Sequence, residues 1–193
     1  HLGPYPMERL ARAALLPVGP AAPGPAREKD LPGAHAAIPR GMPAYLKLFQ
    51  SVRDGAVAAQ FAPIPEDLAS RAHNVKAGVY FLDSDVCGVC EMPDDAWTAT
   101  EHPGHRYAVV ILNAFAKQPE AGTLEAQWIA GTQGTRADLR AAEVAVVTAG
   151  YIRNLGFPAT AHFSGASAVD MNRLALLAGV ALVRQGRLSN PFL

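Results

Sequence analysis

The hydrophobic pattern changes along the chain, and from residue 66 onward it alternates between helical and extended periodicity. Residues 66–77 repeat apolar positions at helical spacing, and Gly78 stands where a helix stop is expected. Two later segments, residues 86–92 and 107–115, are apolar runs bounded by turn-forming residues, which is typical of strands. The pattern therefore predicts one helix followed by two strands.

A long helix is predicted over residues 123–155, with a break near Gly131 and Gly134, because glycine weakens a helix interior. The second part of this helix carries an apolar stripe wide enough for a largely buried helix. We expect its core side to include Leu139, Val146, Ile152 and Leu155. Gly156 and Pro158 then follow as a helix stop.

Shorter elements are predicted near the C-terminal end of the chain. Residues 159–163 have the composition of a strand, and Ser167 with Asp170 forms a capping-box variant that opens a helix closed by Gly179. A strand over residues 180–183, a turn and a return strand over 187–189 follow. With few strands and long helices, we expect an α+β fold in which helices pack on a small, nitroreductase-like sheet.

Residues 1–65 differ from the rest of the chain in their proline content and in their lack of long periodic segments. We interpret them as an N-terminal extension to an α+β domain formed by residues 66–193. Four prolines between residues 17 and 25 exclude a helix interior or a central strand there, because proline fixes φ and lacks a backbone donor. This segment is a Pro/Ala/Gly-rich arm. A short helix at residues 7–16, a turn at 40–43 and helical spacing over 45–52 complete the extension.

Charge and composition narrow the possible partners. The chain has 193 residues, 18% of them charged, and a formal net charge of zero. Because a cationic surplus is missing, we expect no nucleic-acid partner. No apolar run reaches the length of about 18 residues that a membrane-spanning helix needs, and the first residues lack the features of a secretory signal. We therefore expect a soluble, cytoplasmic protein without a membrane partner.

Cys87 and Cys90 are the two cysteines of the sequence, so the chain cannot supply four thiolates to a zinc or iron–sulfur centre. Residues three apart in a strand point to opposite faces, which favours structural packing of both thiols. A redox pair or metal site is the alternative, and it would need a bulge at Gly88. We predict no metal-ligating residues.

Other polar residues give weaker indications. His102, His105 and His162 show no triad spacing, so solvated side chains are favoured over catalysis or ligation. Asp83 and Asp85 resemble a solvated loop more than a cation site. The sequence has no glycine-rich phosphate motif. We assign no catalytic residue.

Ser164, Gly165 and Ser167 form the local feature that looks most like a binding site. They lead from a predicted strand into a predicted helix, whose unpaired N–H groups and positive dipole end favour an anion. We name these three residues as candidate cofactor-binding residues. Plain helix capping by Ser167 and Asp170 is the alternative.

Several segments taken together resemble one known family. The resemblance lies in residues 1–10, 80–97 (beginning Tyr-Phe-Leu-Asp-Ser-Asp-Val-Cys-Gly-Val-Cys), 142–157, 169–180 and 186–193. These segments resemble the N-terminal portion of cobalamin-dependent reductive dehalogenases, especially the soluble catabolic type, to which the epoxyqueuosine reductases are related. The similarity extends over nearly the whole chain.

The resemblance implies a nitroreductase-like domain, a corrinoid cofactor and two 4Fe–4S clusters that deliver electrons to cobalt, which removes halide from a small organohalide. The cysteine runs of that family, and the tyrosine and basic residue that assist reduction, have no counterpart here. We therefore expect a scaffold portion that is inactive and without bound cofactor on its own. Its expected partner is a missing C-terminal part of the same protein; a free-standing relative that lost the reaction is the alternative.

Two further functions stay open at this point. A flavin-binding nitroreductase-like oxidoreductase would need basic residues near the flavin phosphate, and few besides Arg106 and Arg136 are available. A non-catalytic domain that binds the remainder of its own protein is the other. For a scaffold, we expect an exposed apolar patch beside residues 180–183 and the Pro-rich arm.

Overall fold

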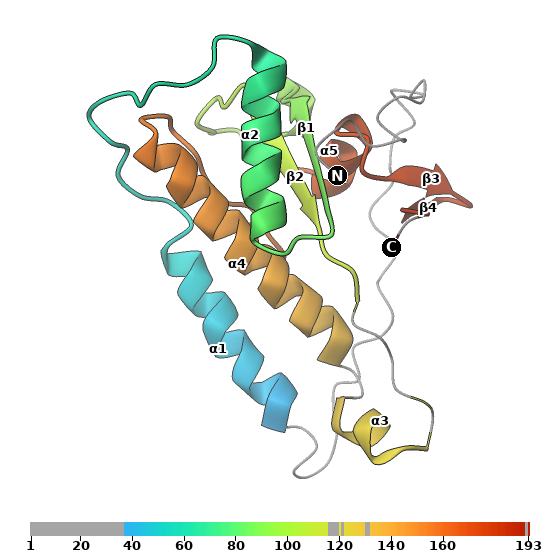
Figure 1. Ribbon diagram of the computed structural model, residues 1–193. Helices are drawn as coiled ribbons and strands as arrows, with labels where there is room; N and C mark the ends of the chain where they lie inside the picture. Colours follow the sequence, from blue (N-terminus) through green and yellow to red (C-terminus); the bar gives the residue numbers. More distant parts are fainter. Residues whose placement is uncertain (1–36, 116–119, 121, 130–131, 192) are drawn as a thin grey trace.

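The computed structural model describes residues 37–115, 120, 122–129, 132–191 and 193 (Figure 1). Within them, the helices and strands follow in the order α1 (Ala37–Ser51), α2 (Leu68–Phe81), β1 (Val86–Glu91), the 3-10 helix η3 (Asp94–Ala96), β2 (Tyr107–Leu112), α3 (Leu124–Ile129), α4 (Thr132–Asn154), α5 (Met171–Leu177), β3 (Leu182–Arg184) and β4 (Arg187–Ser189). The expected α+β class is confirmed. The predicted arm and the helix at residues 7–16 lie outside the described residues.

Helix α4 is the central element, and the other layers are arranged around it (Figure 1). Helix α1 packs along one side of α4, while α2 and β2 contact it on another side. Helix α5 packs on β1 and β2. The fully buried positions of α4 include the small residues Ala142 and Ala149, which allow neighbouring backbones to approach closely.

Strands β1 and β2 pair antiparallel, with Val86 opposite Leu112 and Glu91 opposite Tyr107. Cys87 faces Val79 of α2 and Val144 of α4, whereas Cys90 packs on the opposite side, beside α5. The prediction that the two thiols lie on opposite faces is therefore confirmed. Strands β3 and β4 form a hairpin whose two turn residues, Gln185 and Gly186, both have positive φ, as a type I′ turn requires.

Several predicted boundaries agree with the structure. The break in the long helix falls between the end of α3 at Ile129 and the start of α4 at Thr132, close to the predicted position, although Gly134 itself lies inside α4. The two strands of the first hairpin and the return strand β4 are also found where the sequence placed them.

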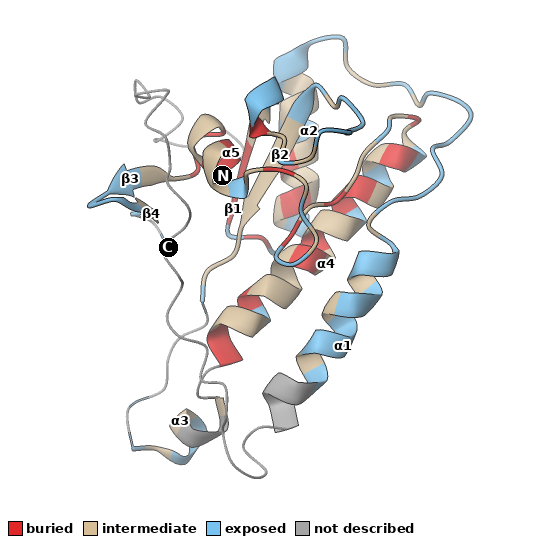
Figure 2. Ribbon diagram, turned by 180° about the vertical axis from the view of Figure 1, so that it is seen from behind, coloured by how far each residue is buried: buried red, intermediate tan, exposed pale blue. Residues whose placement is uncertain are grey.

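The turn predicted at residues 40–43 is wrong, because these residues lie within α1, with Pro43 inside the helix. Proline removes one helical hydrogen bond, but its φ is compatible with a helix. Leu46 and Phe49 pack against the apolar cluster on α4, and this tertiary contact compensates for the lost bond. Figure 2 shows α1 as a largely exposed helix. Tyr45 and Leu48 in α1, and Val52 directly after it, are exposed apolar side chains.

The helix stop predicted at Gly78 is also wrong, since α2 continues to Phe81. The reason is again packing: Val79, in the last turn, is fully buried against Cys87 and Val144. A contact of this kind outweighs the weak helix propensity of a single glycine.

Residues 159–163 do not form the predicted strand; the structure has only an isolated bridge between Phe163 and Ala166. Their backbone groups find other partners. The N–H of Ala161 donates to the carbonyl of Arg53, and the carbonyl of Ala159 accepts from the Arg153 side chain at 2.8 Å. Side-chain and loop partners therefore replace a strand ladder here.

The expected core side of α4 needs correction as well. Leu139, Val146, Ile152 and Leu155 are only partly buried, whereas the buried apolar residues of this part of α4 are Ala142, Val144 and Ala149. Val146 packs at the edge of the cluster shared with α1. Ile152 and Leu155 instead line a large cavity.

Candidate functional site

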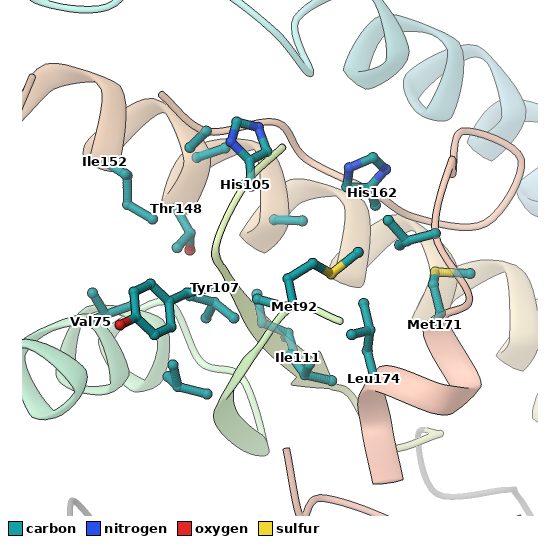
Figure 3. Close-up of a pocket in the computed structure, with 18 of the residues that line it drawn as sticks. Val75, Met92, His105, Tyr107, Ile111, Thr148, Ile152, His162, Met171 and Leu174 are labelled. Carbon is teal, nitrogen blue, oxygen red and sulfur yellow. The ribbon is translucent and has the colours of Figure 1, made fainter. Parts of the chain in front are cut away.

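A cavity of about 1200 Å³ opens between α2, β2 and α4 and extends towards α5 (Figure 3). Its wall is mainly apolar, with Val75, Ile111, Ile152 and Leu174 among the side chains that point into it. A concave apolar surface with few polar groups is the usual form of a binding site.

The cavity surrounds one edge of β2. Every residue of β2 lines it, from Tyr107 to Leu112. Val109 and Ile111 belong to the side of the sheet that faces α2 and α4, whereas Val110 belongs to the α5 side. Because both sides open into the same cavity, the cavity passes around the edge of β2 that does not pair with β1.

Three polar side chains in the cavity wall have atoms without a hydrogen-bond partner among the described residues. The Thr148 hydroxyl is one, and this residue is only 6% exposed (Figure 3). The Asn113 amide and Nε2 of His162 are the others. A buried polar group without a partner is costly, so these atoms mark places where a group from outside can bind.

An indole with three imidazoles lies at one end of the cavity. The ring of His102 stacks on Trp97, with centroids 4.5 Å apart and planes within 10°. His105 and His162 lie 6.3 and 6.0 Å from the same indole. The described residues contain no group of three or more His, Cys, Asp and Glu that could hold a metal ion. The contacts that the structure shows in this cluster are ring contacts with the indole of Trp97.

Two of these histidines are held by specific contacts. Nε2 of His105 lies 3.4 Å from the Thr160 hydroxyl. Nδ1 of His162 accepts from the N–H of Ala168 at 3.2 Å, which assigns the ring proton of a neutral imidazole to Nε2. The imidazole of His162 therefore serves as a hydrogen-bond acceptor for a backbone N–H.

Burial lowers the pKa of both His105 and His162, because it disfavours the charged ring. The nearby charge of Arg53 lowers the pKa of His162 further, while Asp54 opposes the shift in both. Burial raises the pKa of Asp54 itself, but hydrogen bonds from Thr160 and Arg53 outweigh this and hold the pKa below its ordinary value. The imidazoles therefore favour the neutral form.

The predicted binding residues Ser164, Gly165 and Ser167 lie in a tight turn that is fixed to α1. The carbonyl of Gly165 accepts from the Gln50 side chain, and the next carbonyl accepts from Arg53. Ser164 lines the large cavity, whereas Gly165 and Ser167 are not part of its wall.

The predicted capping by Ser167 is wrong. Its hydroxyl contacts the backbone of Val169, and the side chain that caps α5 is Asp170, which accepts from the N–H of Arg173 at 3.0 Å. The structure therefore explains this turn by local hydrogen bonding, with the cap one turn later than expected.

The acidic and basic candidates are engaged elsewhere. Asp83 forms an ion pair with Arg140 at 3.4 Å, and Asp85 accepts from the N–H of Ala114 at 2.7 Å. Arg106 lines the large cavity, whereas Arg136 lines a second, smaller one. The two arginines proposed for a flavin phosphate thus do not converge on one site.

Sequence reasoning missed both the cavity and the grouping of the rings on Trp97. His102 and His105 follow Trp97 closely along the chain, but His162 reaches it only through the fold. The one usable signal was the apolar run of β2, which is too uniform for a strand with a solvent-facing side.

Comparisons with known proteins give a consistent result. No known family profile matches the chain, and no curated protein matches it. The chain is similar to the solved structure of the catabolic reductive dehalogenase NpRdhA, with 40% identity and a TM-score of 0.83 over 99% of this chain and 27% of the other.

Two further solved structures agree. One, described as suggesting a mechanism for B12-dependent dehalogenation, has 41% identity, a TM-score of 0.83 and the same coverage. The other is NpRdhA in complex with 3-bromo-4-hydroxybenzoic acid, with 40% identity, a TM-score of 0.82 and coverage of 99% of this chain and 26% of that one.

No described helix is long and apolar enough to span a membrane. The chain spans about a quarter of the length of the solved proteins it matches. With 40% identity over nearly every residue and a shared fold, the chain is similar to a part of the catabolic reductive dehalogenase NpRdhA that makes up 27% of its length.

Proposed function

We propose that this chain is the N-terminal scaffold portion of a cobalamin- and iron–sulfur-dependent reductive dehalogenase, which removes halide reductively from an organohalide. The observation that carries the proposal is the match itself: 40% identity over 99% of this chain but over only 27% of the dehalogenase. The nitroreductase-like character of the fold, and the division into residues 1–65 and 66–193, belong to the same proposal.

The residues of this chain do not fit iron–sulfur clusters. Each 4Fe–4S cluster needs four thiolates, and the two cysteines point to opposite faces of β1. The thiolates must therefore come from another part of the dehalogenase.

Among the described residues, the predicted binding turn does not form a cradle for a corrinoid either. The carbonyls of Gly165 and Ala166 are already used by Gln50 and Arg53, and Asp170 occupies the N-terminus of α5. Among the predicted binding residues, Ser164 keeps access to the cavity. We therefore assign cobalamin to the remainder of the dehalogenase and give this chain a positioning role.

The physical basis of a scaffold is the open apolar surface. Monomeric proteins rarely leave large contiguous apolar patches in water. Here β2 is only partly buried, the cavity beside it is apolar, and Phe61, Phe81 and Phe115 are each more than half exposed. Covering these surfaces with the remainder of the dehalogenase contributes stabilisation of about 25 cal/mol per Å² of apolar area.

The experiment is a comparison of this chain with the complete dehalogenase polypeptide that contains it. Each is titrated with hydroxocobalamin and, separately, with FMN, and the absorption spectrum is followed. Bromide release from 3-bromo-4-hydroxybenzoic acid is then measured with a chemical reductant. We expect spectral changes with cobalamin and bromide release for the complete polypeptide and neither for this chain. Tight corrinoid binding with turnover by this chain alone would overturn the scaffold role, and FMN binding would favour the flavin enzyme.

A further inference from the structure

Strand β2 has the sequence of an interior strand and the position of an edge strand. Its residues, Tyr-Ala-Val-Val-Ile-Leu, include no charge, proline or glycine. Continuous apolar runs are typical of strands that are covered on both faces and have neighbours on both sides. Edge strands are normally protected by charged residues, prolines or bulges. Within the described residues, however, β2 pairs with β1 alone.

The register shows which backbone groups of β2 face the open edge. The N–H of Met92 donates to the carbonyl of Arg106 at 2.8 Å, which makes these two residues a hydrogen-bonded pair. Hydrogen-bonded and non-hydrogen-bonded pairs alternate along an antiparallel ladder. It follows from the register that the N–H and C=O groups of Tyr107, Val109 and Ile111 point away from β1.

A second, independent contact supports this assignment of inward-facing and outward-facing backbone groups. Cys87 lies opposite Ile111, so its N–H must also point away from the ladder. It donates to the hydroxyl of Tyr80 at 3.3 Å, on the outer side of β1. On the outer side of β2, the described residues provide no backbone partner for Val109 or Ile111.

The side chains that surround the open edge of β2 are mainly apolar. The cavity passes from the α4 side of β2, lined by Ile152, around the edge to the α5 side, lined by Leu174. Backbone donors and acceptors beside apolar walls need protein partners once the cavity is closed. A strand is the element that supplies such partners in register.

We propose that, in the complete dehalogenase, an extended segment from the part of the polypeptide outside this chain adds to β2 as the next strand of the sheet. This inference rests on the proposed function. The occupant follows from the length of the relatives: the solved dehalogenases match 99% of this chain with only 27% of their own length, so each carries far more polypeptide. Because both sides of the cavity are apolar, the segment presents apolar side chains on both of its faces.

Amide hydrogen exchange tests the proposal residue by residue. We expect the amides of Val109 and Ile111 to exchange rapidly in the 193-residue chain. In the complete polypeptide they should slow about 100-fold or more, because an amide in a ladder exchanges only when the structure opens locally. The amides of Ala108 and Val110, which face β1, should be protected in both samples.

The other outcomes separate this proposal from the proposed function. If α2 and α4 gain protection in the complete polypeptide but Val109 and Ile111 still exchange rapidly, strand addition is wrong and the scaffold role stands. If neither the two helices nor the amides of Val109 and Ile111 gain protection in the complete polypeptide, strand addition and the scaffold role are both wrong. Protection of Val109 and Ile111 in the 193-residue chain alone means that a second copy or the chain's own arm pairs with β2, and this too overturns the proposal; sedimentation identifies which.

A proline variant provides a second test. Val109→Pro removes one outward N–H without removing a donor to β1, so it should lower the melting temperature of the complete polypeptide more than that of the 193-residue chain. Val183→Pro is the matched control, because its N–H also points outward, from the exposed β3–β4 hairpin. An equal effect of Val109→Pro in both polypeptides would contradict strand addition.

Discussion

Two glycines have opposite roles at the scale of single residues. A Cβ atom added at Gly88 would lie 2.6 Å from the carbonyl oxygen of Ala178 and 2.6 Å from a methyl group of Val180. Gly88 therefore lets α5 and the chain after it approach β1. A Cβ atom at Gly78, in α2, would meet nothing within 4 Å.

This difference predicts effects of opposite sign. Gly88→Ala should destabilise the chain by about 1–3 kcal/mol, since overpacking forces the backbone apart. Gly78→Ala should stabilise it by about 0.5–1 kcal/mol, because alanine favours the helix and fits the open space. Urea unfolding of both variants measures the two values. A destabilising Gly78→Ala would contradict the continuation of α2 through this position.

The histidines at the cavity predict a pH dependence of stability. Burial lowers the pKa of His105 and His162 in the folded chain. As the pH falls through the ordinary pKa of histidine, the unfolded chain therefore binds more protons than the folded chain does. The free energy of unfolding should therefore decrease from pH 7.5 to pH 5.5. The double variant His105→Gln/His162→Gln should show a shallower decrease in thermal unfolding experiments. An unchanged slope would mean that other groups cause it.

One buried arginine joins elements that the chain places far apart. Arg153, at the end of α4, is 8% exposed and donates to the carbonyls of Arg53 and Ala159. It thereby connects α4 to the segment after α1 and to the irregular segment before α5.

Arg153→Met should cost about 2 kcal/mol or more, because it leaves the Ala159 carbonyl without its donor and the Arg53 carbonyl with the Ala161 N–H alone. Arg136→Met is the control, since Arg136 is exposed on the same helix; it should change stability by less than about 0.5 kcal/mol. Chemical denaturation of the two variants checks the comparison. Equal, small effects would show that the Arg153 contacts do not hold these elements together.

The elements also show what could be predicted from the sequence. The β1–β2 strands, the break before α4 and the C-terminal hairpin follow from local periodicity and turn residues. Pro43 within α1 and the irregular residues 159–163 could not be predicted, because packing on α4 and the Arg153 side chain decide them. The site depended on tertiary structure in the same way: His162 reaches Trp97 only through the fold.

At the scale of the whole molecule, several apolar surfaces are left open. An apolar cavity is open along β2, and an apolar stripe of α1, with Leu48 at its centre, is exposed. The patch expected beside residues 180–183 and the Pro-rich arm stays a prediction, because the arm lies outside the described residues; near 180–183, Val183 is exposed and Ala181 lines the cavity. The proposed scaffold role therefore requires the remainder of the dehalogenase to cover the cavity.

Methionine oxidation tests this requirement most directly. Met171, 42% exposed, and Met92 line the cavity, while Met42 on α1 does not. Solvent-accessible methionine is converted to the sulfoxide, which mass spectrometry detects residue by residue. With hydrogen peroxide, Met171 and Met92 should react several-fold more slowly in the complete polypeptide than in the 193-residue chain, and Met42 should serve as the internal reference. Oxidation of Met171 at the same rate in both would contradict the scaffold account.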